Sequence, residues 1–523
     1  MMLLYLYMIV LGVGATVLWK QKQNAKSHSG RPLPGPPGKP FVGNLLDIPK
    51  VHSWLRFKEG ADGYGPIFQL NIAGRKHVVI SQEKIANDLL RERGSLYSSR
   101  EYLPFASGLL SDNLRPLLLP YNDRWRRGRK LMHQLTATTV VTGYEPVQDY
   151  ESKRLLASFL KAPRDYEKWF ERYACGVVYR LGFGRWIETG QETDFRRIVR
   201  VGKEVERVAS PGQYLVDSFP FLMNLPLPLA PFKREGARLH AEELSLFRKL
   251  QQDVREALER GDSVQSFTRT FLENQKTFRL SDDEAAYVIG TLFEAGTGTT
   301  AAAMMSFCLA MCHHPEWQTK MQSELDRQVG DRMPEFKDIP NLPTVRAVIK
   351  EVLRWRPVTA GNVPHQLTQD DTYQGHFFPK GTVFHANQWA IHRDPELYPD
   401  PENFRPERWL DPSFPTYREP LTQFPNMHNY SCFGFGRRSC PGQSIAERSL
   451  NILTARIAWA ATLSRKKDAD GHLMPLPLYD YCPGFNVQPN FFEFDVIARS
   501  PKRAEQIAAA YKEARLMRDQ ILT

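Results

Sequence analysis

The chain has 523 residues, and its content of 42% hydrophobic, 24% charged and 11% aromatic residues excludes a mostly disordered protein. Its 69 basic and 58 acidic side chains give a formal net charge of +11, which favours an anionic partner, while their even spread along the chain argues against nucleic acid. Six scattered cysteines exclude a disulfide scaffold and favour a reducing compartment.

The first 19 residues carry no charged side chain, and basic residues follow at Lys20 and Lys22. As a helix this segment spans about 28 Å, enough for a thin bilayer. It lacks the basic start and the small-residue cleavage site of a signal peptide, and its positive flank leaves the remaining chain in the cytosol. We therefore expect a single transmembrane anchor over residues 1–19 and a basic, Pro-rich hinge over residues 20–40.

The body of the chain is predicted to be helix-rich with small strand clusters. Residues 66–81 have the pattern of a β-hairpin, residues 83–355 are chiefly of helical period, and residues 363–390 indicate further strands. A Pro-rich meander over 394–432 precedes a helix that begins after Pro441 and runs to about residue 463. The fold class is therefore mainly α with small β-sheets (α+β), as one unit over residues 41–500 and a surface helix over 501–523.

One long helix is expected over residues 281–314. Ser281 and Glu284 form a capping-box signature at its start. Its middle, residues 295–300, holds two glycines and three threonines, which are poor helix formers. This sequence suits either a local widening that admits a ligand or a close crossing with another helix, and the stretch alone favours neither.

The most specific segment is Phe433-Gly434-Phe435-Gly436-Arg437-Arg438-Ser439-Cys440-Pro441-Gly442. Cys440 stands before Pro441, which suits the first turn of a helix, so its sulfur would lie near helix N–H groups that stabilise a thiolate. The glycines allow a flat ligand to approach the backbone, and the arginines can bind carboxylates. No second cysteine stands at zinc-like spacing.

These residues resemble the cysteine loop of the cytochrome P-450 haem-thiolate monooxygenases. Further segments agree with that family in the same order along the chain: Trp125 and Arg129 with its haem-facing helix, residues 295–300 in part with its oxygen-activation motif, Glu351 and Arg354 with its Glu-x-x-Arg helix, and residues 404–409 with its meander motif. The resemblance implies the cytochrome P-450 fold with one N-terminal transmembrane helix.

The resemblance also implies a role for each matching residue. Cys440 is expected to be the axial ligand of the iron of haem b, with Phe433 packed near its sulfur. The haem propionates are expected to bind Trp125, Arg129, His365 and Arg438. Glu351, Arg354 and Arg408 are expected to form a structural charge cluster, and Thr299 to be the catalytic hydroxyl that contacts dioxygen and helps to deliver protons.

One position departs from the family pattern. The residue before the catalytic threonine is usually an acid, and here it is Gly298. Protons must then pass through Thr299 and water, come from the substrate, or come from a more distant group such as Glu294. The alternative to a changed proton route is a changed reaction, namely oxidative coupling of phenols.

The resemblance therefore implies a monooxygenase that oxidises a lipophilic small molecule, a secondary metabolite of fungal type, with dioxygen. No Gly-rich nucleotide fingerprint occurs, so electrons are expected from a partner, an NADPH-cytochrome reductase. The expected location is the endoplasmic reticulum membrane with the catalytic domain in the cytosol. The alternatives are an oxidative phenol-coupling enzyme on the same fold and a non-catalytic haem-binding sensor.

Overall fold

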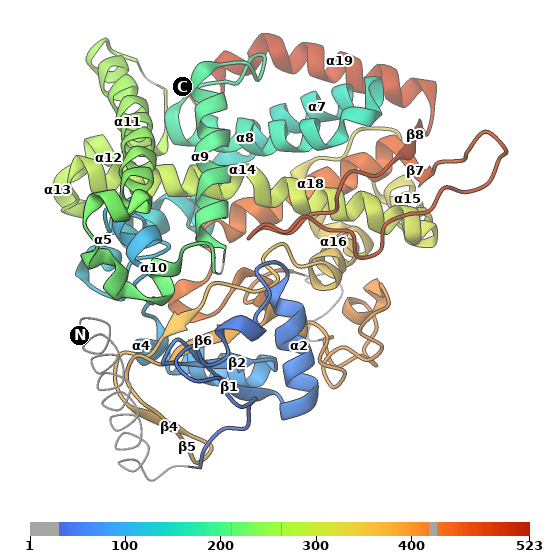
Figure 1. Cartoon of the computed structure of the whole chain (residues 1–523). Helices are drawn as coiled ribbons and strands as arrows, with labels where there is room; N and C mark the ends of the chain where they lie inside the picture. The colour runs from blue at the N-terminus through green and yellow to red at the C-terminus, as the bar shows by residue number, and fades with distance from the viewer. Residues whose placement is uncertain (1–30, 211, 263, 418–425, 523) are drawn as a thin grey trace, which may run out of the picture.

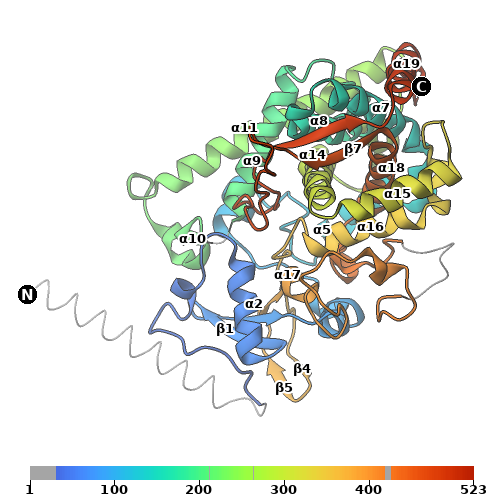
Figure 2. The same ribbon diagram turned by 90° about the vertical axis from the view of Figure 1, so that its right-hand side faces the viewer.

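The computed structural model describes residues 31–210, 212–262, 264–417 and 426–522, so the predicted anchor and the first part of the hinge lie outside the described residues (Figure 1). Long helices and one pair of strands form one part of the body, and the other small strands gather at its other end (Figures 1 and 2). The predicted class, mainly α with small β-sheets, is confirmed. The helices of twelve or more residues are α2 (Ser53–Tyr64), α5 (Asp123–Thr136), α7 (Glu145–Lys161), α8 (Tyr166–Phe183), α9 (Thr193–Ala209), α11 (Pro231–Glu259), α14 (Asp282–His313), α15 (Pro315–Gln328), α16 (Pro343–Trp355), α18 (Gln443–Ala460) and α19 (Pro501–Met517).

The strands form one sheet of four and two pairs. β1 (Ile67–Ile72) and β2 (Arg75–Ile80) are the predicted hairpin, and β2 runs parallel to β6 (Val383–Ala386). β3 (His365–Gln366) completes this sheet by pairing with β6. The two pairs are β4 (Asp371–Tyr373) with β5 (His376–Phe378), and β7 (Ala461–Arg465) with β8 (Phe494–Ala498). The four-stranded sheet therefore joins residues about 300 positions apart in the chain.

Helix α14 is the central element of the body. The Ser281 side chain accepts from the N–H of Glu284 and the Glu284 side chain accepts from the N–H of Ser281, so the predicted capping box is present. The helix is continuous through residues 295–300, without a break at the glycines and threonines there. Among the described helices it alone is long and apolar enough to cross a membrane, but 67% of its apolar window is buried, as in a core helix.

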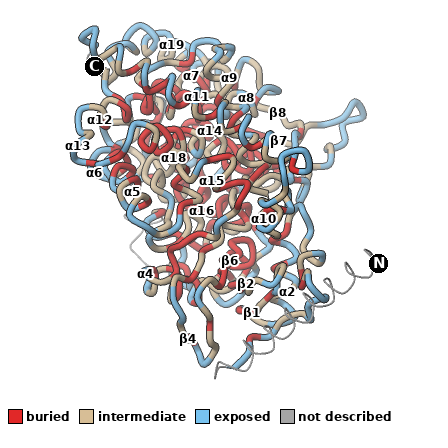
Figure 3. Tube along the Cα trace, turned by 60° about the vertical axis from the view of Figure 1, so that its left-hand side comes forward, coloured by how far each residue is buried: buried red, intermediate tan, exposed pale blue. Residues whose placement is uncertain are grey.

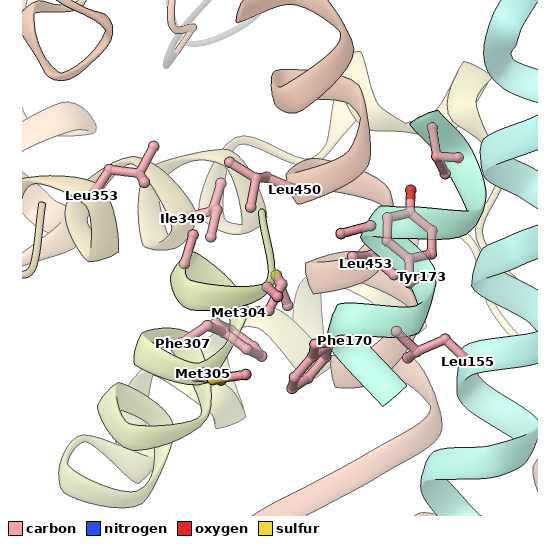
Figure 4. Close-up of a cluster of buried hydrophobic side chains, with 14 of the residues drawn as sticks. Leu155, Phe170, Tyr173, Met304, Met305, Phe307, Ile349, Leu353, Leu450 and Leu453 are labelled. Carbon is pink, nitrogen blue, oxygen red and sulfur yellow. The ribbon is translucent and has the colours of Figure 1, made fainter. Parts of the chain in front are cut away.

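The main hydrophobic core forms where five helices meet. Figure 4 shows Leu155 of α7, Phe170 and Tyr173 of α8 and side chains of α14, α16 and α18 pointing toward one another. The α14 members labelled there are Met304, Met305 and Phe307, all at most 1% exposed. In Figure 3 the buried residues concentrate along these helices, while the outer helix α19 is largely exposed. The core therefore fixes the position of the C-terminal half of α14.

The two glycines in the middle of α14 have different surroundings. A Cβ atom on Gly296 would lie 2.3 Å from Cγ1 of Val178 on α8, so a close helix crossing requires glycine there. A Cβ atom on Gly298 would meet no heavy atom within 4 Å. The two interpretations of this segment thus apply to different residues, because Gly296 serves packing and Gly298 faces open space.

One helix boundary differs from the sequence-based expectation, which placed the end of the helix after Pro441 at about residue 463. The helix after Pro441 begins at Gln443 and ends at Ala460, where the chain continues directly into β7. β-Branched and apolar residues near this junction fit either element, and pairing with β8 decides for the strand. The described part of the hinge packs against the sheet end of the body: Leu33 is buried, and the N–H of Arg31 donates to the carbonyl oxygen of Gly375 at 3.0 Å.

The contrast between the glycines predicts opposite effects on stability. Gly296→Ala should destabilise the protein by about 1–3 kcal/mol, because the added methyl group must displace α8. Gly298→Ala, the matched control, should be neutral or stabilising by up to about 1 kcal/mol, because alanine is the better helix former. Chemical unfolding of the two variants beside the unaltered chain measures both. Equal effects would contradict the assignment of the crossing to Gly296.

Candidate active site

The loop before α18 holds Cys440 in place through its backbone. Its two short turns are η10 (Ser431–Phe433) and η11 (Gly436–Arg438). The N–H of Cys440 donates to the carbonyl oxygen of Phe433 at 2.8 Å, which closes the loop. Gly436 has φ +55°, and a Cβ atom there would lie 2.2 Å from the carbonyl oxygen of Leu90. Only glycine fits this conformation and contact.

Cys440 is an exposed residue at the N-terminal end of α18. Surrounding protein atoms nevertheless desolvate its thiol and thereby raise its pKa, while the backbone N–H of Gly442, the charge of Arg129 and the N–H of Gln443 act in the opposite direction. The helix begins at Gln443, after Pro441 as expected. The residue is therefore exposed and its sulfur lies beside N–H donors, which favour a thiolate ligand.

Three guanidinium groups gather beside this loop. Arg438 donates to the carbonyl oxygens of Ser98 (2.7 Å), Pro116 (3.2 Å) and Leu119 (2.6 Å). Arg129 of α5 donates to the carbonyl oxygen of Ser439 at 2.8 Å. The buried Arg100 donates to the carbonyl oxygens of Leu117 (3.2 Å), Val363 (2.8 Å) and Pro364. Backbone carbonyls thus fix the positions of three cations.

The charge of this guanidinium cluster is not neutralised within the described part of the chain. No carboxylate lies within ion-pair distance of Arg100, Arg129 or Arg438 among the residues described there. Desolvation lowers the pKa of Arg100 to about 9 and, together with the charges of Arg100 and Arg129, that of Arg438 to about 8. Buried cations of this kind require an anionic ligand. The donor set therefore fits the two carboxylates of a haem.

Trp125 and His365 lie against the same cluster. The backbone N–H of Trp125 donates to the side-chain oxygen of Asn122 at 2.9 Å, and Asn122 thereby caps α5. Cζ of Arg438 lies 4.3 Å from the centre of the Trp125 ring. Nδ1 of the buried His365 lies 2.8 Å from the carbonyl oxygen of Tyr97. Burial and the charges of Arg100 and Arg438 lower the pKa of His365 well below its usual value, so its ring is neutral.

A second charge cluster lies fully inside the protein. Glu351 and Arg354 of α16 and Arg408 of η9 (Pro406–Trp409) are each 0% exposed. Nε of Arg354 lies 2.9 Å from both carboxylate oxygens of Glu351, and Nε of Arg408 lies 3.3 Å from Oε1. Trp409 Nε1 also donates to Glu351, at 3.1 Å. The three predicted residues therefore meet, and they attach α16 to the segment before the Cys440 loop.

Thr299 lies apart from these clusters. Its Oγ1 donates to the carbonyl oxygen of Ala295 at 2.9 Å, one turn earlier in α14. Ala295 is exposed, and residues 296–300 after it are half-buried. None of the hydrogen bonds of the described residues joins Thr299 to the Cys440 loop. The structure thus brings together Trp125, Arg129, His365, Phe433, Arg438 and Cys440, and it places Thr299 on an accessible face of α14.

Sequence analysis did not find Arg100. Its carbonyl partners Val363 and Pro364 stand more than 260 residues later in the chain, so no local spacing connects them. Its sequence neighbours Ser98 and Ser99 are polar and give no sign that the arginine between them and Glu101 is buried. Only the folded structure identifies it as the third cation of the cluster.

Comparison with known proteins agrees with this geometry. The family description Cytochrome P450 matches residues 33–458. The chain is 35% identical over 503 residues to cytochrome P450 monooxygenase virE of Hypocrea virens, covering 95% of this chain and 91% of that protein. It is 34% identical over 501 residues to cytochrome P450 monooxygenase fogE of Aspergillus ruber, covering 95% and 93%. A solved structure of a zebrafish cytochrome P450 with abiraterone has a TM-score of 0.68 and 24% identity, covering 86% of this chain and 100% of that chain, which shows a shared fold.

The buried charge cluster yields a stability prediction. Glu351→Gln leaves the guanidinium groups of Arg354 and Arg408 buried without a counter-charge, and it should cost about 3–5 kcal/mol of unfolding free energy. Glu59→Gln is the matched control, because Glu59 pairs with Arg56 at 2.9 Å with both side chains more than half exposed. That change should cost less than about 1 kcal/mol. Urea unfolding of both variants measures the difference, and similar costs would show that the buried cluster does not stabilise the fold.

Proposed function

Since this chain belongs to the cytochrome P450 family and is a haem-dependent monooxygenase of the fungal type, we propose that Cys440 is the axial ligand of its haem iron. The observation that supports this proposal most directly is the exposed residue Cys440, whose sulfur lies beside the N–H groups of Gly442 and Gln443. A thiolate stabilised in this way donates electron density to a bound metal. Phe433, whose carbonyl oxygen accepts from the N–H of Cys440, would shield the sulfur from water.

The proposed cofactor is haem b, held by its two propionates. Arg129, Arg438 and the newly identified Arg100 would supply the positive charge, because these cations meet no carboxylate in the described part of the chain. Trp125 and His365 would complete the binding surface with an indole N–H and a neutral imidazole. Glu351, Arg354 and Arg408 would keep the loop-bearing segment in place and so retain the haem.

When bound, haem supplies the reduction of dioxygen and the transfer of one oxygen atom to the substrate. The side chains of the chain would then orient the reactants and move protons. Thr299 is proposed as the catalytic hydroxyl, because it lies beside the accessible Ala295 and its lone pairs can accept from water while its hydrogen is held by the carbonyl oxygen of Ala295.

The electron donor is proposed to be an NADPH-cytochrome reductase, and the substrate a lipophilic secondary metabolite. The exposed Arg126 and Arg437 lie 5.6 and 5.3 Å from the centre of the Tyr121 ring, next to the Cys440 loop. Together with the net charge of +11, these cations suit an acidic redox partner. Names of relatives from several fungi, which describe monooxygenases, support the general activity rather than a particular substrate.

The proposed location is the endoplasmic reticulum membrane, with the catalytic domain in the cytosol. Its basis is the uncharged segment 1–19 and the basic residues that follow it. The corresponding division is an anchor over 1–19, a hinge over 20–40, a haem-binding domain over 41–500 and a surface helix over 501–523.

A second candidate reaction is oxidative coupling of phenols on the same haem. The observation that favours it is Gly298, which stands where the family has an acid and has open space around it. A phenol gives up hydrogen atoms readily and can supply its own proton. Product analysis with phenolic and non-phenolic substrates separates the two reactions.

The proposed ligand predicts a spectroscopic result. Reduced wild-type protein under carbon monoxide should show the red-shifted absorbance band of a thiolate-ligated haem, and Cys440→Ser should lose that band and its turnover, because a neutral hydroxyl donates far less charge to iron. Cys432→Ser is the control, since Cys432 lies in the same loop at half-buried depth. It should keep the band. Normal turnover by Cys440→Ser would disprove the assignment.

The proposed anchor predicts a change of location. Removal of residues 1–30 should move the protein from the membrane to the soluble fraction without loss of the haem spectrum. The deletion must stop at residue 30, because Arg31 and Leu33 already bind the folded body. Fractionation of cells that express the two forms measures this. A truncated protein that folds but lacks haem would contradict a separable anchor.

A further inference from the structure

A buried ion cluster connects three elements beside the middle of α14. Arg115, in the segment between η3 (Pro104–Leu110) and α5, pairs with Glu243 of α11 through one terminal nitrogen and with Glu294 of α14 through the other. The three side chains are 1%, 1% and 7% exposed. Nε of Arg115 also donates to Oγ of Ser111 at 3.3 Å. One guanidinium thus joins two carboxylates away from bulk water.

The charges of this cluster do not balance unless it holds a proton. Two carboxylates against one guanidinium leave a net negative charge in a buried place, and burial raises the pKa of Glu294 although Arg115 acts to lower it. Glu243 Oε2 and Glu294 Oε1 are buried and have no hydrogen-bond partner among the described residues. A shared proton on one of these oxygens removes the excess charge. The other titratable groups near the cluster are Tyr287, His240, Glu206, Asp112 and Asp283.

The outer end of the cluster borders a pocket. A cavity of about 400 Å³ lies between α9 and α11, and Glu243 forms part of its wall. Its other walls include the exposed Arg200 and Arg238, so solvent enters it. Of the three cluster residues, Glu243 alone lines this pocket.

The inner end of the cluster leads toward Thr299. Glu294 stands four residues before Gly298, so the two positions share one face of α14. The space beside Gly298 is open, since a Cβ atom there would meet nothing within 4 Å. One helical turn is about 5.4 Å, a span that one or two waters bridge. Gly298 precedes Thr299 in the chain, so the open space adjoins the residue of the proposed catalytic hydroxyl.

We propose that Glu294, held by Arg115 and resupplied through Glu243, donates protons to the space beside Gly298 in place of the acid that this chain lacks there. The inference rests on the proposed function. Monooxygenation consumes one dioxygen, two electrons from the reductase and two protons; one oxygen atom enters the oxidised substrate and the other leaves as water. Glu294 gives its proton to a water beside Gly298, that water passes a proton on beside Thr299, and Glu294 regains one from Glu243, which takes one from pocket water.

The first test measures protonation in the resting protein, without turnover. Infrared spectra should contain the C=O band of a buried protonated carboxyl group that shifts in D₂O and weakens in Glu294→Gln. Glu151→Gln is the matched control: Glu151 is buried on α7 and desolvation raises its pKa to about 8, so its own band should disappear and that of the cluster should stay. An unchanged cluster band in Glu294→Gln would overturn the proposal.

The second test measures coupling. Glu294→Gln should lower product formed per NADPH roughly 100-fold and raise peroxide accordingly, comparable to Thr299→Ala, because a general acid contributes about 10²–10⁴-fold. Gln keeps an oxygen for Arg115, so the fold is retained. Gly298→Asp added to Glu294→Gln should restore most of the product, because the open space accepts a carboxyl group. Glu151→Gln should couple normally.

Normal coupling by Glu294→Gln, or no rescue by Gly298→Asp, would overturn the proposal. If Glu294→Gln fails to fold, Glu243→Gln replaces it: reduced coupling with a pH optimum moved to lower pH is expected there, and an unchanged profile would overturn the proton inlet. The thiolate spectrum of each variant is recorded first. A wild type without that spectrum would disprove the proposed function itself, so the two failures are distinguishable.

Discussion

A buried guanidinium requires a negative charge nearby. The cluster around Glu351 and the cluster around Cys440 meet that requirement differently. Around Glu351, the chain itself supplies one carboxylate, which pairs with both Arg354 and Arg408 on folding and neutralises one of their two charges. Around Cys440, the described part of the chain supplies carbonyl oxygens and no carboxylate, and carbonyl oxygens orient the cations but cannot neutralise them. The first cluster therefore stabilises the fold in the absence of a ligand, whereas the second is complete only with an anion. Binding of a propionate-bearing haem then also stabilises the folded state.

Helix α14 is tightly packed in its C-terminal half and borders open space in its middle. Its C-terminal half is packed as tightly as any core helix, with Met304 and Met305 at 0% exposure. Its middle carries the exposed Ala295 and the unobstructed Gly298, and Gly296 between them lets α8 approach closely. The close crossing holds the helix in place on one side, so the opposite side can stay free of packing. The Thr297 and Thr299 hydroxyls donate to carbonyls of Glu294 (2.7 Å) and Ala295 (2.9 Å), which keeps their polar groups satisfied without side-chain neighbours.

The sequence predicted those features that are local or carried by a dense motif. The hairpin at β1 and β2, the capping box at Ser281 and the loop around Cys440 depend on residues within 13 positions of one another, as Ile67 and Ile80 are. The partners of Arg100 and Arg115 come from distant segments, and a lone arginine in a sequence gives no sign of its burial. The end of α18 was also misplaced, because only the β8 strand, more than 30 residues later, shows that residue 461 is extended. Long-range pairing therefore sets the limit of sequence analysis here.

A carboxyl group at position 294 has different neighbours from a carboxyl group at position 298, and those neighbours determine whether it is protonated. At position 298 a carboxyl group would stand alone on α14, with no heavy atom near its Cβ. At position 294 the carboxyl group is tied through Arg115 to α11 and to the segment after η3. These two elements pack on each other and, through Glu243 and Leu110, form walls of the pocket between α9 and α11. A displacement of α11 from α14 would break an ion pair and expose the carboxylates, which in water lose their shared proton. Glu294 can therefore stay protonated only while α11 remains packed against α14.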